Sequence, residues 1–170
     1  FVDAWIMGEY AQIFLNSSKL VIGTLILNLT VSGLAGFSLA KLYPRGSNAF
    51  LVYLLVGVSI PAQMFILPLF LMWKELGLMN THLGLIIIYA GLNAPFATFL
   101  IRSYMIQLPD ELFDAAKIDG ANTLQLFYRI ALPISWPVFL TTGLVVGLAV
   151  WNEFLFALTF VHDDSKKPIA

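Results

Sequence analysis

Side chains that could carry out chemistry are few in this sequence. Glu153 is the only carboxylate with long apolar sequence on both sides, and in that setting it could serve as a general base inside a membrane. Catalysis would need a second group at a similar depth, and only Asn152 and His162 lie near it in the chain. There is no cysteine, and His82 has no other ligand-type residue at metal-binding spacing. An intramembrane enzyme is therefore one alternative, and no bound metal is expected.

Composition indicates which kind of protein must position these residues. Of the 170 residues, 59% are hydrophobic and 11% are charged, with a net charge of -1. Soluble domains have roughly 45 to 50% apolar and about 25% charged residues, so this chain has too few polar side chains to cover a surface in water. The absence of a basic block also predicts that nucleic acid is not a partner. We predict a protein embedded in the lipid bilayer.

Four long runs carry no charged residue, at 20–40, 46–73, 76–101 and 130–152. A helix needs about 20 apolar residues to cross a hydrocarbon layer of about 30 Å, so each run is long enough alone. Buried helices of a soluble core would keep a polar stripe for water, and these runs have almost none. The sequence therefore predicts an all-α, polytopic membrane protein with transmembrane helices at 15–42, 49–73, 82–106 and 133–160.

The distribution of lysine and arginine indicates which side of the membrane each connection faces. Four crossings bring both ends of the chain to one side, opposite to the loops at 41–48 and 102–130. Five Lys and Arg residues fall in these loops and four on the other side, which favours the cytoplasm for the loops. Segments 1–14 and 161–170 are then extracytoplasmic. Because the chain begins at Phe1 and stops soon after the fourth run, we expect it to be a fragment.

One connection, LPDELFDAAKIDGANTLQLFYRIALP at 108–133, is strongly patterned. Pro109 can occupy the first position of a short helix that ends at Ile118, because the first helical N–H has no partner within the helix. Asp110 and Glu111 place negative charge at the positive end of that helix. Gly120 suits the left-handed residue that ends a helix, so it is expected to be a hinge between two helices.

A second helix is expected directly after this hinge. Asn122 and Gln125 form an N-cap and N3 pair that would open it. Apolar residues then recur at helical spacing, which predicts one buried face made of Leu124, Phe127, Tyr128 and Ala131. Isolated helices of this length are unstable in water, so the hairpin must dock on the membrane helices, on a partner, or on both.

The string DAAKIDGA at 114–121, followed by Phe127 and by Leu132-Pro133, resembles the EAA loop of binding-protein-dependent ABC importer permeases. The E-A-A core, the glycine and the leucine-proline pair all match, except that Asp114 stands where Glu is usual. Strings such as IPAQ at 60–63 and WNEF at 151–154 extend the resemblance over nearly the whole chain, to the carbohydrate group that contains the maltose permease subunits. Members usually have six spans, so this chain would supply the middle four.

The resemblance implies an ABC type I importer permease fold, with these segments forming one permease domain. The cytoplasmic EAA coupling loop would then be 107–132, seated against a cytoplasmic ATPase dimer. The residues implied in coupling to the ATPase are Asp114, Ala115, Ala116, Asp119, Gly120, Ala121 and Phe127. Further implied partners are a second permease subunit and an extracytoplasmic solute-binding protein. No cofactor is expected on this chain, since ATP and Mg would be bound by the partner ATPase, and the location implied is a bacterial or archaeal inner membrane.

The function implied is a permease subunit for ATP-driven sugar import, and the chain would not itself be an enzyme. Asn93, Asn152 and Glu153 are candidates for lining the translocation path, although hydrogen bonding between helices is a commoner role for such amides. Glu153 lies either beside a polar cavity or near the outer interface. Another polar solute such as a glycerol phosphate, an intramembrane enzyme, and a channel or scaffold subunit remain alternatives.

Overall fold

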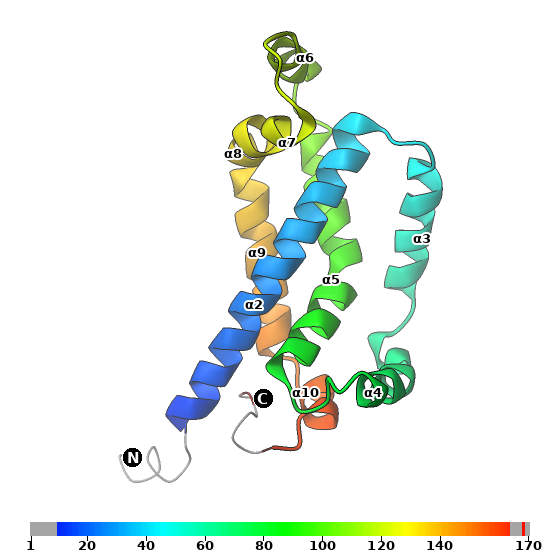
Figure 1. Cartoon of the computed structure of the whole chain (residues 1–170), viewed down its shortest axis with the longest axis vertical. Coiled ribbons are helices and arrows are strands. Elements are labelled where there is room, and N and C mark those ends of the chain that lie inside the picture. Colours follow the sequence, from blue (N-terminus) through cyan, green and yellow to red (C-terminus); the bar gives the residue numbers. More distant parts are fainter. Residues whose placement is uncertain (1–9, 164–167, 169–170) are drawn as a thin grey trace. The chain divides into compact units, whose positions relative to one another are not determined.

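All regular elements in the described part of the chain are helices. The computed structural model describes residues 10–163 and residue 168, and the remaining parts of the predicted segments 1–14 and 161–170 lie outside it. In chain order (Figure 1), the elements are α2 Tyr10–Phe37, η1 Ser38–Leu42, α3 Ser47–Ser59, η2 Ala62–Phe65, α4 Ile66–Glu75, α5 His82–Met105, α6 Asp110–Ile118, α7 Thr123–Leu126, η3 Phe127–Ala131, α8 Leu132–Ile134, α9 Trp136–Trp151 and α10 Leu155–Phe160. The predicted all-α class is confirmed.

Two continuous helices, Tyr10–Leu42 and His82–Met105, are long and apolar enough to cross a membrane. Up to four spans result if each of two bent helix pairs counts as one. These pairs are Ser47–Ser59 with Ala62–Glu75, bent by 94°, and Thr123–Ile134 with Trp136–Trp151, bent by 78°. The predicted spans 49–73 and 133–160 are therefore not single helices, and the first helix is already formed at Tyr10, before the predicted start at residue 15.

Pro61 marks the break in the predicted span 49–73. It has no N–H to donate, and its backbone is extended at φ -57° and ψ 127°, which ends the preceding helix. The sequence predicts breaks or bends at Pro68 and Pro95 as well. Pro68 instead lies in the first turn of α4, where its missing N–H costs little, and Pro95 lies inside α5 without ending it.

The predicted span 133–160 is interrupted after Trp151. Both the backbone N–H and the side-chain amide of Asn152 donate to the carbonyl of Leu148, the latter at 2.7 Å, and the helix ends there. A new helix, α10, then begins at Leu155. Hydropathy alone did not predict this interruption, since the residues on both sides of it are apolar.

The chain divides into two compact units, and each has its own hydrophobic core. Among the described residues, the first unit contains 10–27, 60–92, 146–163 and 168, and the second contains 28–59 and 93–145. The core of the first unit includes Leu20, Trp73, Leu85, Tyr89, Val146, Phe156 and Phe160. The core of the second unit includes Phe37, Ile101, Met105, Phe113, Phe127, Ala131 and Phe139.

In the second unit, α2 and α5 approach each other closely at Gly36. A Cβ atom added to Gly36 would lie 3.2 Å from the backbone nitrogen of Arg102 and 3.1 Å from a side-chain carbon of Ile101. A larger residue would push the two backbones apart by a few tenths of an ångström, as expected where small residues pack between membrane helices. The junction lies at the end of α5 from which the chain continues into α6 (Figure 1).

Candidate functional site

The predicted acidic helix is α6, Asp110–Ile118. Pro109 is its N-cap rather than its first residue, with an extended backbone at φ -58° and ψ 131°, so the prediction was displaced by one residue. Asp110 and Glu111 occupy the first turn, where they interact favourably with the positive end of the helix. Phe113 points into the core of the second unit and is buried there. Phe113 therefore attaches the beginning of the helix to the core of its unit.

Gly120 ends α6 in the way that the sequence predicts. Its φ of +84° lies in the left-handed region, which glycine adopts without strain. The N–H of Gly120 donates to the carbonyl of Lys117 at 3.0 Å, and the N–H of Ala121 donates to the carbonyl of Ala116 at 2.9 Å. This pair of bonds is a Schellman motif, which satisfies the last carbonyls of the helix.

The second helix of the hairpin opens with the predicted capping box. The Oδ1 of Asn122 accepts from the N–H of Gln125 at 2.9 Å, and the Oε1 of Gln125 accepts from the N–H of Asn122 at 2.8 Å. These reciprocal bonds fix the chain direction directly after Gly120. Two local motifs therefore set the angle between α6 and α7.

The predicted buried face of the second helix is only half right. Phe127 and Ala131 are buried, but Leu124 and Tyr128 are exposed. The reason is that Phe127–Ala131 forms a π-helix, in which hydrogen bonds join residues five apart. Residues five apart then share a face, so that Leu126 joins Ala131 in the core. A period of 3.6 residues cannot predict this register.

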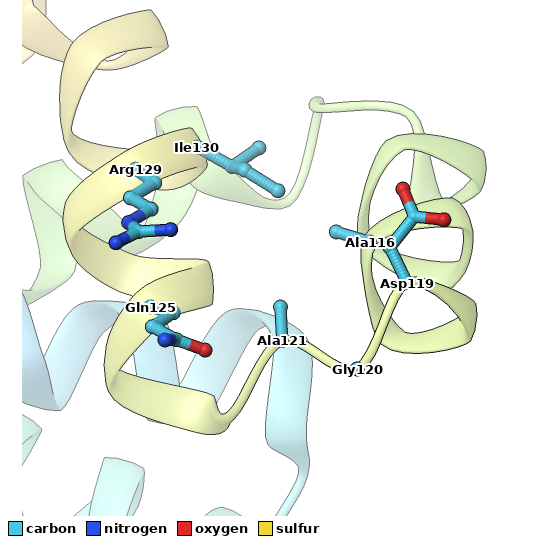
Figure 2. A pocket seen from close by; sticks show the side chains of 7 residues that line it. All are labelled: Ala116, Asp119, Gly120, Ala121, Gln125, Arg129 and Ile130. Carbon is cyan, nitrogen blue, oxygen red and sulfur yellow. The ribbon is translucent and has the colours of Figure 1, made fainter.

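Between α6 and the second helix lies an open cleft of about 370 Å³. Figure 2 shows Gln125, Arg129 and Ile130 on one wall and residues of α6 on the other, with the linker between them. The residues that line the cleft are Ala116, Asp119, Gly120, Ala121, Gln125, Arg129 and Ile130. Both a carboxylate and a guanidinium are thus available to a group that enters, next to small side chains that leave space for it.

The other predicted coupling residues differ in their exposure. Asp114 is exposed, and its Oδ1 accepts from the Nζ of Lys117 at 2.9 Å within the same helix. Ala115 is also exposed. Phe127 is only 3% exposed and packs on Phe37, with ring centroids 5.5 Å apart. It can therefore influence a partner only by supporting the hairpin from inside.

Ile118 and Lys41 are two residues whose importance the sequence did not reveal. Ile118 lies at the end of α6 and is 87% exposed, although it is apolar. An isoleucine between Lys117 and Asp119, two positions before the hinge glycine, was the available signal. In the sequence, Lys41 is only one of the five positive charges of the two predicted cytoplasmic loops. In the structure, its side chain is buried and bonded to the start of α6. Its partners are distant in sequence, so no local pattern could reveal them.

Glu153, a candidate for the translocation path, accepts hydrogen bonds from three residues of the first unit. Its carboxylate accepts from the hydroxyl of Tyr89 at 2.8 Å and from the backbone N–H groups of Phe156, at 3.1 Å, and Ala157, at 3.4 Å. Those two N–H groups belong to the first turn of α10, where they have no partner within the helix. The side chain therefore caps α10 and ties it to α5. Of the other two candidates, Asn152 is exposed and Asn93 is half-buried.

We expect Glu153→Ala to destabilise the first unit by about 1 to 2 kcal/mol, because the first turn of α10 would lose its capping acceptor. The free energy of unfolding in mixed detergent micelles measures this effect. Tyr89→Phe is the matched control, since it removes one donor and leaves the cap intact, and a smaller loss is expected. Equal losses in the two variants would contradict the capping role.

Comparison with known proteins adds information on the whole chain. Residues 32–164 match the family model described as binding-protein-dependent transport system inner membrane component. A probable ABC transporter permease protein of Bacillus subtilis, YurM, is 36% identical over 99% of this chain and 56% of its own length. A diacetylchitobiose uptake system permease protein of Streptomyces coelicolor is 31% identical over 98% of this chain and 55% of its length.

A solved structure also matches the fold. It is a crystal structure of a bacterial ABC transporter involved in the import of the acidic polysaccharide alginate, with a TM-score of 0.84 and 25% identity. The match covers 92% of this chain and 55% of the solved one. The chain thus spans about half the length of each protein that it matches.

Proposed function

This chain belongs to the family of binding-protein-dependent transport system inner membrane components, and from that premise we propose that it is a permease subunit of an ATP-driven ABC importer for sugars. The observation that carries the proposal is the acidic helix α6, which begins after α5 and ends at the hinge Gly120. Sugar as the cargo is supported by the two relatives whose names refer to diacetylchitobiose and alginate.

The hairpin formed by α6 and α7 is the proposed contact with a cytoplasmic ATPase dimer, as the EAA coupling loop. Asp114 and Ala115 are exposed on α6, and Ile118 exposes an apolar side chain beside them. This face of α6 therefore offers a partner both a negative charge and an apolar side chain. Asp119, Gly120 and Ala121 add the cleft, which is open to a side chain of the partner.

The ATPase supplies the energy in this proposal, and this chain transmits it. ATP and Mg are bound by the ATPase chains, and the permease moves between inward-facing and outward-facing states. A second permease subunit completes the translocation path, and an extracytoplasmic solute-binding protein delivers the sugar. The complex lies in the inner membrane of a bacterium or archaeon, with both ends of this chain extracytoplasmic. The family membership favours this function over an intramembrane enzyme or a channel.

Asn93, Asn152 and Glu153 remain the proposed residues of the translocation path. Asn152 is supported best, because it is exposed and its amide, with one N–H donated to Leu148, keeps a second N–H and an oxygen that can bond sugar hydroxyls. Glu153 is supported least, since its carboxylate already accepts bonds from Tyr89 and from the start of α10. Changing Asn152 should therefore affect the KM for sugar more than changing Glu153 does.

Asp114→Arg is expected to lower ATP-driven uptake about tenfold, because it replaces the negative charge at the centre of the contact with a positive one. The measurement is co-purification of the full-length permease with its ATPase, followed by uptake into proteoliposomes loaded with ATP. Diacetylchitobiose and alginate oligosaccharides serve as probes, and glycerol 3-phosphate tests the alternative cargo. Asp163→Arg, beyond α10 in the first unit, is the control.

Three results would refute parts of this proposal. Intact assembly and uptake in Asp114→Arg would exclude the coupling contact. Uptake of glycerol 3-phosphate alone would replace the cargo and keep the transporter. Passive flux without ATP, or a purified complex without nucleotide-binding chains, would favour a channel or scaffold subunit.

A further inference from the structure

Lys41 is a buried lysine at the end of the first long helix, in the π-helix η1. Its side chain is only 5% exposed. The Nζ donates to the carbonyl of Leu108 and to the Oδ1 of Asp110, both at 2.6 Å. It also lies 5.2 Å from the centroid of the Phe113 ring, within the range of a cation–π interaction. One ammonium group thus contacts the residue before Pro109, the first residue of α6 and the buried aromatic of α6.

A second cation, Arg102, joins the same two segments by a bond from α5 to η1. The Nε of Arg102, near the end of α5, donates to the carbonyl of Leu39 in η1 at 3.4 Å. Lys41 thus bonds the carbonyl of Leu108, three residues beyond the end of α5, and Arg102 bonds a carbonyl of η1. Together with the close contact at Gly36, these bonds hold η1 and α5 together at the point from which α6 begins.

The neighbouring ion pair on α6 is different in kind. Lys117 and Asp114 are three residues apart in one helix, and both side chains are largely exposed. Such a pair contributes little and connects α6 to nothing else. Lys41 and Asp110 are 69 residues apart and join separate elements. A buried ammonium requires such partners, because burial without them is costly.

We propose that Lys41 is a positioning residue that couples α6 to the first long helix, so that displacement of α6 moves that helix. The transmission of motion rests on the proposed function, whereas the bonds of Lys41 are contacts within this chain. Phe113 allows α6 to pivot on an aromatic contact, while the bonds of Lys41 to Leu108 and Asp110 resist separation of the two elements. Without the ammonium, α6 still packs through Phe113 but loses its hydrogen bonds to η1.

The test compares substitutions in the assembled complex of full-length permease, ATPase and binding protein. Lys41→Met keeps the length of the apolar stem and removes all bonds of the ammonium, and Lys41→Arg keeps the charge. Lys74→Met, at an exposed lysine of α4 outside the hairpin, is the matched control. Hydrogen exchange of segment 110–118 follows attachment of the helix, and ATP hydrolysis and uptake of diacetylchitobiose or alginate oligosaccharide are measured on the same proteoliposomes.

We expect Lys41→Met to speed exchange of segment 110–118 about tenfold and to lower uptake per ATP hydrolysed by a similar factor, a scale that follows from losing one buried charge-assisted hydrogen bond. The ATPase still co-purifies and still hydrolyses ATP. Lys41→Arg restores most of the ratio of uptake to ATP hydrolysis, and Lys74→Met leaves both measurements near the starting values. A structural role alone would lower hydrolysis and uptake together and would not change their ratio.

Unchanged exchange in Lys41→Met would overturn the proposal, as would equal effects in Lys74→Met. If Lys41→Met does not assemble, Asp110→Asn decides. Asp110 is 78% exposed, and its replacement leaves the ammonium of Lys41 bonded to the carbonyl of Leu108. If Asp110→Asn changes neither the uptake per ATP hydrolysed nor the exchange of segment 110–118, the proposal is overturned. If Lys41→Met speeds exchange but the complex without substitutions takes up neither sugar when ATP is supplied, the proposed function is refuted and the contact made by Lys41 stands.

Discussion

Gly120→Pro is expected to abolish coupled uptake, with a drop of roughly 100-fold or more in the population of the correctly folded hairpin, since proline in such a position costs about 3 kcal/mol. Proline holds φ near -65°, whereas Gly120 has a φ of +84°. It also removes the N–H that donates to the carbonyl of Lys117. Both the turn and one bond of the Schellman motif are lost, so α6 would leave the chain in a different direction.

Gly120→Ala separates the backbone strain from the loss of the bond. A Cβ at this position would meet nothing within 4 Å, so only the positive φ disfavours alanine, by about 1 kcal/mol. The measurements are co-purification with the ATPase and uptake per ATP hydrolysed, as for Lys41. Alanine should retain most of the activity. If proline also left assembly and uptake intact, the hinge would have no part in coupling.

Phe127→Ala is expected to lower the free energy of unfolding by about 3 to 5 kcal/mol, because it leaves a large cavity in the core of the second unit. Phe127 packs on Phe37 and lies beneath the hairpin, beside Gly33, where an added Cβ would be 3.4 Å from its ring. Loss of this support should also release α7 from its place below α6. Unfolding in mixed detergent micelles measures the effect.

Leu124→Ala is the control that distinguishes the observed register from the periodic one. A period of 3.6 residues puts Leu124 and Phe127 on the same buried face. In the structure Leu124 is exposed, so its truncation should change the free energy of unfolding by less than about 0.5 kcal/mol. Comparable losses in the two variants would show that the helix buries the face predicted from the period and not the face set by the π-helix.

The features that the sequence predicts correctly depend on neighbours in the chain. The Schellman motif at Gly120 and the capping box of Asn122 and Gln125 each join residues at most five positions apart. Such bonds form from the local residue types, whatever the rest of the fold does. The apolar runs predict a membrane protein for a similar reason, since each run is long enough by itself.

The continuity of the helices was predicted less well. Hydropathy is averaged over a window and does not register where backbone bonds stop. At the interruption after Trp151, Asn152 bonds to Leu148 of the preceding helix, and Glu153 caps the next helix. Both were candidate path residues because polar side chains in apolar sequence are expected to have functions there. Their bonds to the helix ends give them a structural role in addition.

The sequence by itself determined that this chain is an all-helical membrane protein with a charged hairpin before its last long helix. These properties follow from composition and from bonds between near neighbours. Only the tertiary structure decided that Lys41 is buried and bonds α6, that Glu153 meets Tyr89, and that Phe127 lies in a core instead of at a partner. Each of these depends on side chains more than 60 residues apart or on a π-turn, which local periodicity does not encode.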